Sequence, residues 1–118
     1  IAIGNPADGY YGIKTANASG GYGEDISDEE IVSAMKLLAE TEGVFTETAG
    51  GVTVGVTQKL VQQGRIKPDE VTVICITGNG LKTQEALADC FSAPAVIEAK
   101  IDSFEEIFSN DLALNGLH

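Results

Sequence analysis

The amino-acid sequence predicts an α/β fold, and three observations lead to that prediction. Residues 71–76 read Val-Thr-Val-Ile-Cys-Ile, a nearly continuous apolar run that is typical of a β-strand covered on both faces. Residues 27–39 carry apolar side chains at the spacing of an amphipathic helix. Residues 102–108 repeat that spacing over a shorter length and predict a second, terminal helix. Strands that alternate with helices are typical of α/β proteins.

The first residues predict the end of a strand followed by a helix. Residues 1–3 are apolar and run directly into the turn signal of residues 4–6, Gly-Asn-Pro. We therefore expect a buried strand whose first part lies upstream, and a chain that is one part of a larger protein. A helix is predicted within residues 6–21, because Pro6 suits a first helical turn and the Gly20-Gly21 pair suits a helix end.

The clearest predicted element is the helix of residues 27–39. Ser27 and Glu30 form a capping-box pattern, in which each side chain accepts a hydrogen bond from the backbone amide of the other residue. The acidic residues 28–30 complement the positive end of the helix dipole. The apolar positions that give this helix one buried face are Ile31, Ala34, Met35, Leu38 and Ala39.

Residues 52–57 are ambiguous between a strand and a helix. They read Val-Thr-Val-Gly-Val-Thr, and this alternation of β-branched residues favours a strand. Val52, Val56 and Leu60 also share one helical face, and the neighbouring glycines would let a helix pack very closely. From the residues alone the strand is slightly preferred.

Composition limits the partners and the compartment. The 118 residues suffice for one domain with one core, and the net charge of −11 argues against nucleic acid and anionic membrane surfaces. No apolar stretch has the length of a membrane span. Cys75 and Cys90 lack the spacing of a zinc site, and the chain has a single histidine. Cys75 lies in an apolar run and is expected to be a buried thiol, which favours a reducing, cytoplasmic setting.

The candidate binding residues lie after the predicted strand and before residues 52–57. Ligands of open α/β sheets bind beyond the carboxyl ends of the strands. There Thr77 offers a hydroxyl and Gly78 allows close approach of the backbone, although an ordinary strand-to-loop turn would have the same residues. Glu47 is either a pocket residue or a cap for the following element. No residue set suits a general base, a nucleophile or a metal, so no catalytic residue is assigned.

Four segments together resemble the C-terminal part of the threonine synthase family. They are IAIGNPADG at residues 1–9, SGG with the capped helix at 19–40, TEGVFTETAGG at 41–51 and ITGNGLKT at 76–83. These enzymes are pyridoxal-phosphate enzymes of fold-type II. The resemblance implies a three-layer α/β/α fold of the tryptophan synthase β type, with residues 1–118 as the C-terminal portion of the catalytic domain. It also implies that residues 49–64 form a helix beside the sheet.

The resemblance further implies an activity and a cofactor. Threonine synthases convert O-phospho-L-homoserine and water to L-threonine and phosphate with pyridoxal phosphate, and a homodimer is expected. By this resemblance Thr77 would hydrogen-bond the pyridine nitrogen, while Glu47 and Gly78 would line the cofactor pocket, near a loop that contains Gly4 and Asn5. The lysine that binds the cofactor covalently and the glycine-rich phosphate loop would lie upstream. The isolated chain is therefore expected to be inactive.

Two alternatives stay open from the sequence. One is another fold-type II enzyme, a threonine or serine dehydratase or a cysteine-synthase relative. Those families usually carry a serine-led SGGN-like turn where this chain has residues 76–80, Ile-Thr-Gly-Asn-Gly. The other alternative is a stand-alone acidic regulatory or interaction module, which would have its start codon just before Ile1.

Overall fold

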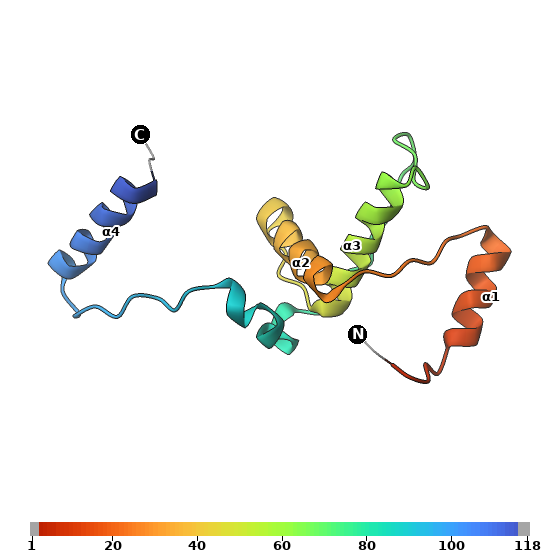
Figure 1. Cartoon of the computed structure of the whole chain (residues 1–118), viewed down its shortest axis with the longest axis horizontal. Helices are drawn as coiled ribbons and strands as arrows, with labels where there is room; N and C mark the ends of the chain where they lie inside the picture. Colours follow the sequence, from red (N-terminus) through yellow and green to blue (C-terminus); the bar gives the residue numbers. More distant parts are fainter. Residues whose placement is uncertain (1–2, 116–118) are drawn as a thin grey trace.

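The computed structural model describes residues 3–115, and the side chains of residues 3–109. The helices are α1 (Gly9–Ser19), α2 (Asp28–Glu42), α3 (Thr48–Gln62), the 3₁₀ turns η1 (Gly80–Lys82) and η2 (Gln84–Cys90), and α4 (Ile101–Asn115). Helices α2 and α3 lie together in the centre, whereas α1 and α4 lie at opposite ends of long extended connections (Figure 1). The strand end predicted at residues 1–3 falls mostly outside the described residues.

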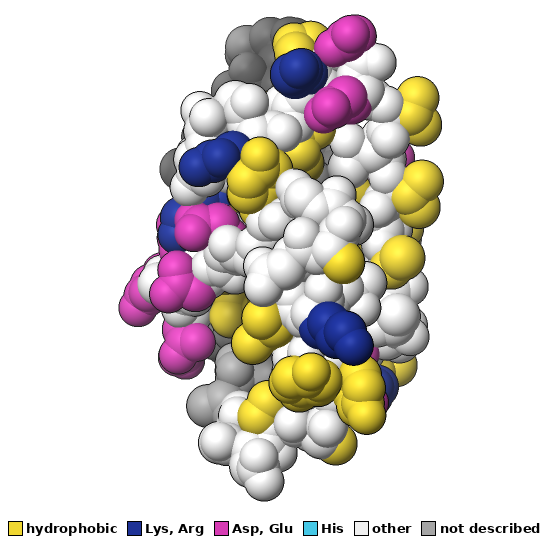
Figure 2. Space-filling model, turned by 90° about the vertical axis from the view of Figure 1, so that its right-hand side faces the viewer, with side chains coloured by type: hydrophobic (Ala, Val, Ile, Leu, Met, Phe, Trp, Pro, Cys, Tyr) yellow, Lys and Arg dark blue, Asp and Glu magenta, His cyan; other side chains and the backbone are white. Residues whose placement is uncertain are grey.

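The chain is elongated and only partly packed. Its radius of gyration is 19.7 Å, whereas a compact domain of this length would have about 13 Å. Its accessible surface is 9327 Å², and a compact protein of this mass would expose about 6,100 Å². Hydrophobic side chains accordingly lie on the surface, as on the face that Figure 2 shows. No helix in the described part is long and apolar enough to cross a membrane.

The packed centre is the contact between α2 and α3. Glycine permits this contact, because a Cβ atom added at Gly51 would lie 2.7 Å from Met35 Cγ and 2.9 Å from the Ile31 carbonyl oxygen. The slight preference for a strand at residues 52–57 was therefore wrong, and the helix that the resemblance implied is confirmed. The buried apolar side chains are Ile31, Ala34, Met35, Val54 and Leu87, the last from η2.

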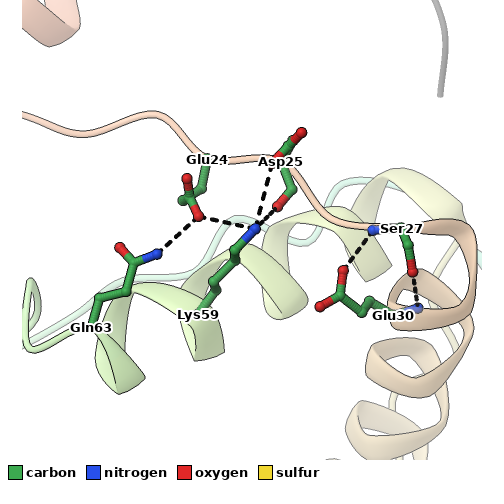
Figure 3. A network of polar contacts seen from close by, with 6 residues as sticks. All are labelled: Glu24, Asp25, Ser27, Glu30, Lys59 and Gln63. Atoms are coloured by element: carbon green, nitrogen blue, oxygen red, sulfur yellow. Dashed lines mark hydrogen bonds and ion pairs between the residues drawn. The ribbon is translucent and has the colours of Figure 1, made fainter.

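The start of α2 follows the predicted capping box. Ser27 Oγ accepts a hydrogen bond from the Glu30 amide at 3.2 Å, and the Glu30 carboxylate accepts one from the Ser27 amide at 2.6 Å (Figure 3). Two orphan amides at the helix end are thereby satisfied. Helix α1 ends as predicted at Gly20, whose φ of 71° suits glycine, but Pro6 precedes the helix instead of lying in its first turn. The predicted helix at residues 102–108 is confirmed within α4.

The predicted sheet is not found in the described residues, which contain no β-strand. Residues 71–76 have no regular secondary structure, and the side chains of Val71 and Val73 are 96% and 82% exposed. Cys75 is exposed, so its predicted burial was wrong. The physical reason is that a strand completes its backbone hydrogen bonds only through a neighbouring strand. No such neighbour lies within residues 3–115, so the α/β class is not confirmed here.

A polar network ties the connection between α1 and α2 to the outer half of α3. Lys59 Nζ donates to the Asp25 carbonyl oxygen at 2.6 Å and lies 3.0 Å from the Glu24 carboxylate (Figure 3). Gln63 donates to the same carboxylate at 2.9 Å. The hydrogen bond to Glu24 is the main cause that raises the pKa of Lys59. This network fixes the path of the chain into α2.

Candidate functional site

Two segments that are distant in the sequence, residues 45–48 and 78–83, lie side by side, and we call their contact the junction. Thr46 and Asn79 form an isolated antiparallel bridge. The Glu47 amide donates to the Gly78 carbonyl oxygen at 3.0 Å, and the Gly80 amide donates to the Phe45 carbonyl oxygen at 3.1 Å. The junction thus brings together Glu47 and Gly78, two of the three predicted binding residues.

The interior of the junction is held by a buried threonine. Thr46 is fully buried, and its hydroxyl donates to the Gly78 carbonyl oxygen at 3.2 Å. That carbonyl oxygen also accepts the Glu47 amide, so it receives two hydrogen bonds. Buried polar groups are stable only when they are paired in this way. The backbone at Gly78 is therefore firmly positioned, although the surrounding chain is extended.

The start of α3 is capped from the far side of the junction. Glu47 occupies the N-cap position with φ −70° and ψ 170°, but its carboxylate makes no capping hydrogen bond. Instead, the amide of Thr48 donates to Thr83 Oγ1 at 3.1 Å. Glu47 therefore occupies the cap position, one of the two roles expected for it, but its side chain does not cap the helix.

The Glu47 carboxylate turns toward Gly78 and Lys82. Its Oε2 atom lies 2.7 Å from Lys82 Nζ, and the glutamate side chain is only 13% exposed. A Cβ atom added at residue 78 would lie 1.9 Å from Glu47 Oε1, so a larger residue there would displace the carboxylate. The sequence predicted close approach at Gly78, and the structure shows that one close neighbour is this carboxylate. Lys82 was not predicted as a site residue, although it lies within the segment ITGNGLKT of residues 76–83.

Thr77 lies at the exposed edge of the junction, immediately before Gly78. Its side chain does not belong to the packed interior, so its hydroxyl can be reached from solvent. Gly4 and Asn5, which were expected near the site, are exposed in a bend ahead of α1. The junction therefore presents an accessible hydroxyl, a mostly buried carboxylate with its cation, and a glycine backbone. A threonine hydroxyl can donate one directional hydrogen bond to a ligand.

Comparisons with known proteins identify the class of enzyme. A family model for pyridoxal-phosphate dependent enzymes matches residues 1–78. The chain belongs to this family of pyridoxal-phosphate dependent enzymes. The family-level resemblance drawn from the sequence is thus confirmed, and the stand-alone module is not supported.

Curated relatives narrow the class of enzyme further, because the three relatives described here are all threonine synthases. The chain is 39% identical over 107 residues to the threonine synthase of Methanocaldococcus jannaschii. The aligned region covers 91% of this chain and 26% of that protein. The chain is 41% identical over 107 residues to the threonine synthase of Methanosarcina acetivorans, with 90% and 26% covered. It is 46% identical over 82 residues to the threonine synthase of a Bacillus species, with 70% and 23% covered. The chain spans about a quarter of the length of these relatives.

The junction fits one side of a pyridoxal phosphate site. Thr77 is an exposed residue whose hydroxyl can donate to a ring nitrogen, and it precedes Gly78, whose Cα is covered by the Glu47 carboxylate. The lysine nearest to them, Lys82, is engaged by Glu47, which does not suit covalent attachment of a cofactor. Thr77 thus fits a hydrogen bond to the ring of the cofactor, whereas Lys82 does not fit its covalent attachment.

Proposed function

We propose that this chain is part of a threonine synthase, which converts O-phospho-L-homoserine and water to L-threonine and phosphate with pyridoxal phosphate. One observation carries the proposal: the alignment with the Methanocaldococcus jannaschii threonine synthase covers 91% of the chain. Only about a tenth of the residues fall outside it, so both segments of the junction, which lie in the interior of the sequence, are included. The candidate site is thus part of the similarity.

In this proposal the junction binds the ring of the cofactor. The cofactor, when bound, supplies an electron sink that stabilises negative charge on substrate carbon atoms. Thr77 donates its hydroxyl hydrogen to the pyridine nitrogen and, being neutral, does not hold a proton on that nitrogen as a carboxylic acid would. Gly78 carries the fixed backbone next to Thr77, and the Glu47 carboxylate that covers its Cα would lie beside the ring.

We further propose that residues 1–118 are the C-terminal portion of a catalytic domain with three α/β/α layers. The lysine for the cofactor and the glycine-rich phosphate loop would come from residues beyond these 118. Two observations support this: the chain spans 26% of its relatives, and the apolar side chains of Val71 and Val73 are uncovered. In the complete domain, residues 71–76 would join a sheet and become buried on both faces.

The burial of residues 71–76 can be measured with the thiol of Cys75. In the 118-residue chain Cys75 and Cys90 are both exposed, so a thiol reagent should label both at similar rates. In the complete protein we expect labelling of Cys75 to slow by at least about tenfold, because burial in a sheet requires local unfolding before reaction. A Cys90→Ser variant isolates the signal of Cys75. Equal labelling rates of Cys75 in the two proteins would contradict the proposed sheet.

The proposal also includes a homodimer in the cytoplasm. The exposed apolar and aromatic side chains of α1, Tyr10, Tyr11 and Ile13, support an interface on that helix. Two free thiols support a reducing compartment, because exposed cysteines are readily oxidised elsewhere. Light scattering of the complete protein tests the dimer.

The activity is tested with the complete polypeptide that contains these residues. It should release phosphate and L-threonine from O-phospho-L-homoserine in equal amounts, and only with pyridoxal phosphate. The 118-residue chain alone should show neither turnover nor the visible absorbance band of lysine-bound cofactor. A complete protein that instead deaminates serine or threonine would favour the dehydratase alternative. An absorbance band with the short chain would contradict the division of the site.

A further inference from the structure

Lys82 is a charged residue of the junction to which the proposed function gives no role. Its Nζ atom lies 2.7 Å from Glu47 Oε2, and its own side chain is 64% exposed, whereas that of Glu47 is 13% exposed. We infer that Lys82 is a positioning residue for the cofactor site, which holds the Glu47 carboxylate against Gly78 and thereby fixes the adjacent Thr77. This inference rests on the proposed function of the junction.

The Glu47 carboxylate needs such a partner, because its place in the helix favours another orientation. A carboxylate at the N-cap is attracted by the free amides and the positive dipole at the start of its helix. In α3 this interaction is not made, and the Thr48 amide is bonded to Thr83 instead. The ammonium group of Lys82 provides the competing attraction. With Oε2 bound to Lys82, Oε1 is the oxygen that lies against Gly78.

The carboxylate in turn restricts the backbone next to Thr77. The Gly78 carbonyl oxygen is fixed by the Thr46 hydroxyl and the Glu47 amide. The Gly78 Cα is covered by the carboxylate, because a Cβ atom built there would meet Oε1 at 1.9 Å. Residue 78 is therefore held on two sides, and Thr77 is bonded to it directly. Loss of the lysine would free the carboxylate and leave one side of Gly78 open.

A different role for Lys82 would be direct contact with an anionic group of the ligand. The two roles predict different results when Glu47 is changed as well. If Lys82 acts through Glu47, its removal has little further effect once the carboxylate is gone. If Lys82 touches the ligand itself, the two changes have independent effects that add. A double-mutant cycle separates these cases.

The experiment uses the complete protein, stripped of cofactor and titrated with pyridoxal phosphate while its fluorescence is followed. The variants are Lys82→Met, Lys82→Arg, Glu47→Gln and the double variant Glu47→Gln with Lys82→Met. Lys100→Met is the matched control, since Lys100 pairs with Glu98 in a fully surface-exposed ion pair away from the junction. The values of kcat and KM for O-phospho-L-homoserine are measured on the same proteins.

We expect Lys82→Met to weaken cofactor binding about tenfold, because the ion pair with a mostly buried carboxylate is lost. Lys82→Arg should stay within about twofold of wild type, since arginine keeps the charge and its donors. Lys100→Met should bind the cofactor as wild type does. The double variant should bind no more weakly than Glu47→Gln alone, and KM should change less than the affinity for the cofactor.

The outcomes distinguish this inference from the proposed function. If the wild-type protein binds pyridoxal phosphate and makes threonine while Lys82→Met binds the cofactor as tightly, the inference is overturned and the function stands. Additive effects of Lys82→Met and Glu47→Gln also overturn it, in favour of direct contact with the ligand. If the wild-type protein neither binds the cofactor nor makes threonine, the proposed function fails, and the positioning role fails with it. Hydrogen exchange at the Glu47 amide shows whether each variant keeps the junction folded.

Discussion

Residues 52–54 and 71–73 both read Val-Thr-Val, and the structure gives them opposite environments. In the first tripeptide Val54 is 6% exposed within α3, the helix that packs against α2. In the second, Val71 is 96% exposed in a segment without regular secondary structure. The identical residues have the same intrinsic preference for extended structure. The difference therefore comes from what lies beside them in the chain and in space.

The neighbours of the first tripeptide explain its helix. Gly51 precedes it and Gly55 follows it, and these two glycines allow α3 to approach α2 more closely than larger residues would. The apolar area buried in that contact outweighs the helix-weakening effect of glycine and valine. The second tripeptide has no comparable partner within residues 3–115. The comparison shows that the residues packed against a Val-Thr-Val segment, more than the segment itself, determine whether it is helical.

The largest expected effect follows from blocking the approach of α3 to α2. In a Gly51→Val variant the new Cβ would lie 2.7 Å from Met35 Cγ and 2.9 Å from the Ile31 carbonyl oxygen. We expect the free energy of unfolding to fall by about 3 kcal/mol, the upper part of the range for overpacked cores. Urea unfolding followed by circular dichroism measures the loss.

Gly12→Val in α1 is the control for that variant, because a Cβ at Gly12 meets no atom within 4 Å. Its stability should change by less than about 0.5 kcal/mol. If both variants lose the same stability, close packing between α2 and α3 is not what makes the first Val-Thr-Val helical.

Local signals in the sequence predicted the end of α1 and the start of α2, whereas the remaining structure depends on contacts between distant residues. Ser27 with Glu30 defined the start of α2, because the capping box involves only neighbouring residues. The exposure of residues 71–76 could not be predicted in this way, since the apolar run shows that burial is favourable but not where the covering residues are. A resemblance to a family corrected residues 52–57, which the local pattern had left ambiguous.

The candidate site, too, could be predicted only in part from local patterns in the sequence. Thr77, Glu47 and Gly78 could be named from their motifs, and the structure brings Glu47 and Gly78 into contact. Lys82 and Thr83 were missed as site residues. Their partners, Glu47 and Thr48, are 35 residues away in each case, and no local pattern signals a contact over that separation. The roles of Thr77, Glu47 and Gly78 toward the cofactor stay predictions.

The second prediction concerns Thr77, which directly follows the exposed segment of residues 71–76. In the complete enzyme, Thr77→Val keeps the shape of the side chain and removes its hydroxyl. We expect the rate to fall by about tenfold to a hundredfold, which corresponds to roughly 1–3 kcal/mol for one lost hydrogen bond. Steady-state assays of threonine formation measure this effect. Thr15→Val on the surface of α1 is the control and should keep the wild-type rate; wild-type rates in both variants would exclude Thr77 as the partner of the ring.

The third prediction concerns the packed region and is smaller. Ser27→Ala removes the hydroxyl that accepts the Glu30 amide at the start of α2. Stability should fall by about 1 kcal/mol, the usual cost of losing an N-cap. Thermal and urea unfolding of the variant give the value. Ser33→Ala is the matched control, since Ser33 is exposed within the same helix and alanine is the better helix former there. An equal loss in both variants would mean that the cap does not stabilise α2.

The smallest expected effect concerns the polar network between Glu24, Asp25 and Lys59. The pKa of Lys59 lies above its ordinary value of 10.5, chiefly because Nζ donates a hydrogen bond to Glu24 and secondarily because of the charges of Glu24 and Asp25. A lysine whose pKa is raised in the folded state stabilises that state while it is protonated. This contribution is complete below the ordinary pKa and is lost as the pH rises through the raised one.

The connection between α1 and α2 should therefore stay bound to α3 at neutral pH and be released only in alkaline solution above pH 10.5. Nuclear magnetic resonance of the Lys59 side chain follows its titration directly. Glu24→Gln should lower the pKa of Lys59 more than Asp25→Asn does, because the hydrogen bond to Glu24 is the larger cause. A larger effect of Asp25→Asn on the pKa of Lys59 would contradict this expectation. Asp25→Asn leaves the 2.6 Å hydrogen bond from Lys59 Nζ to the carbonyl oxygen of residue 25 in place. That result would therefore mean that the side-chain charge of Asp25, and not this backbone contact, attaches the connection to α3.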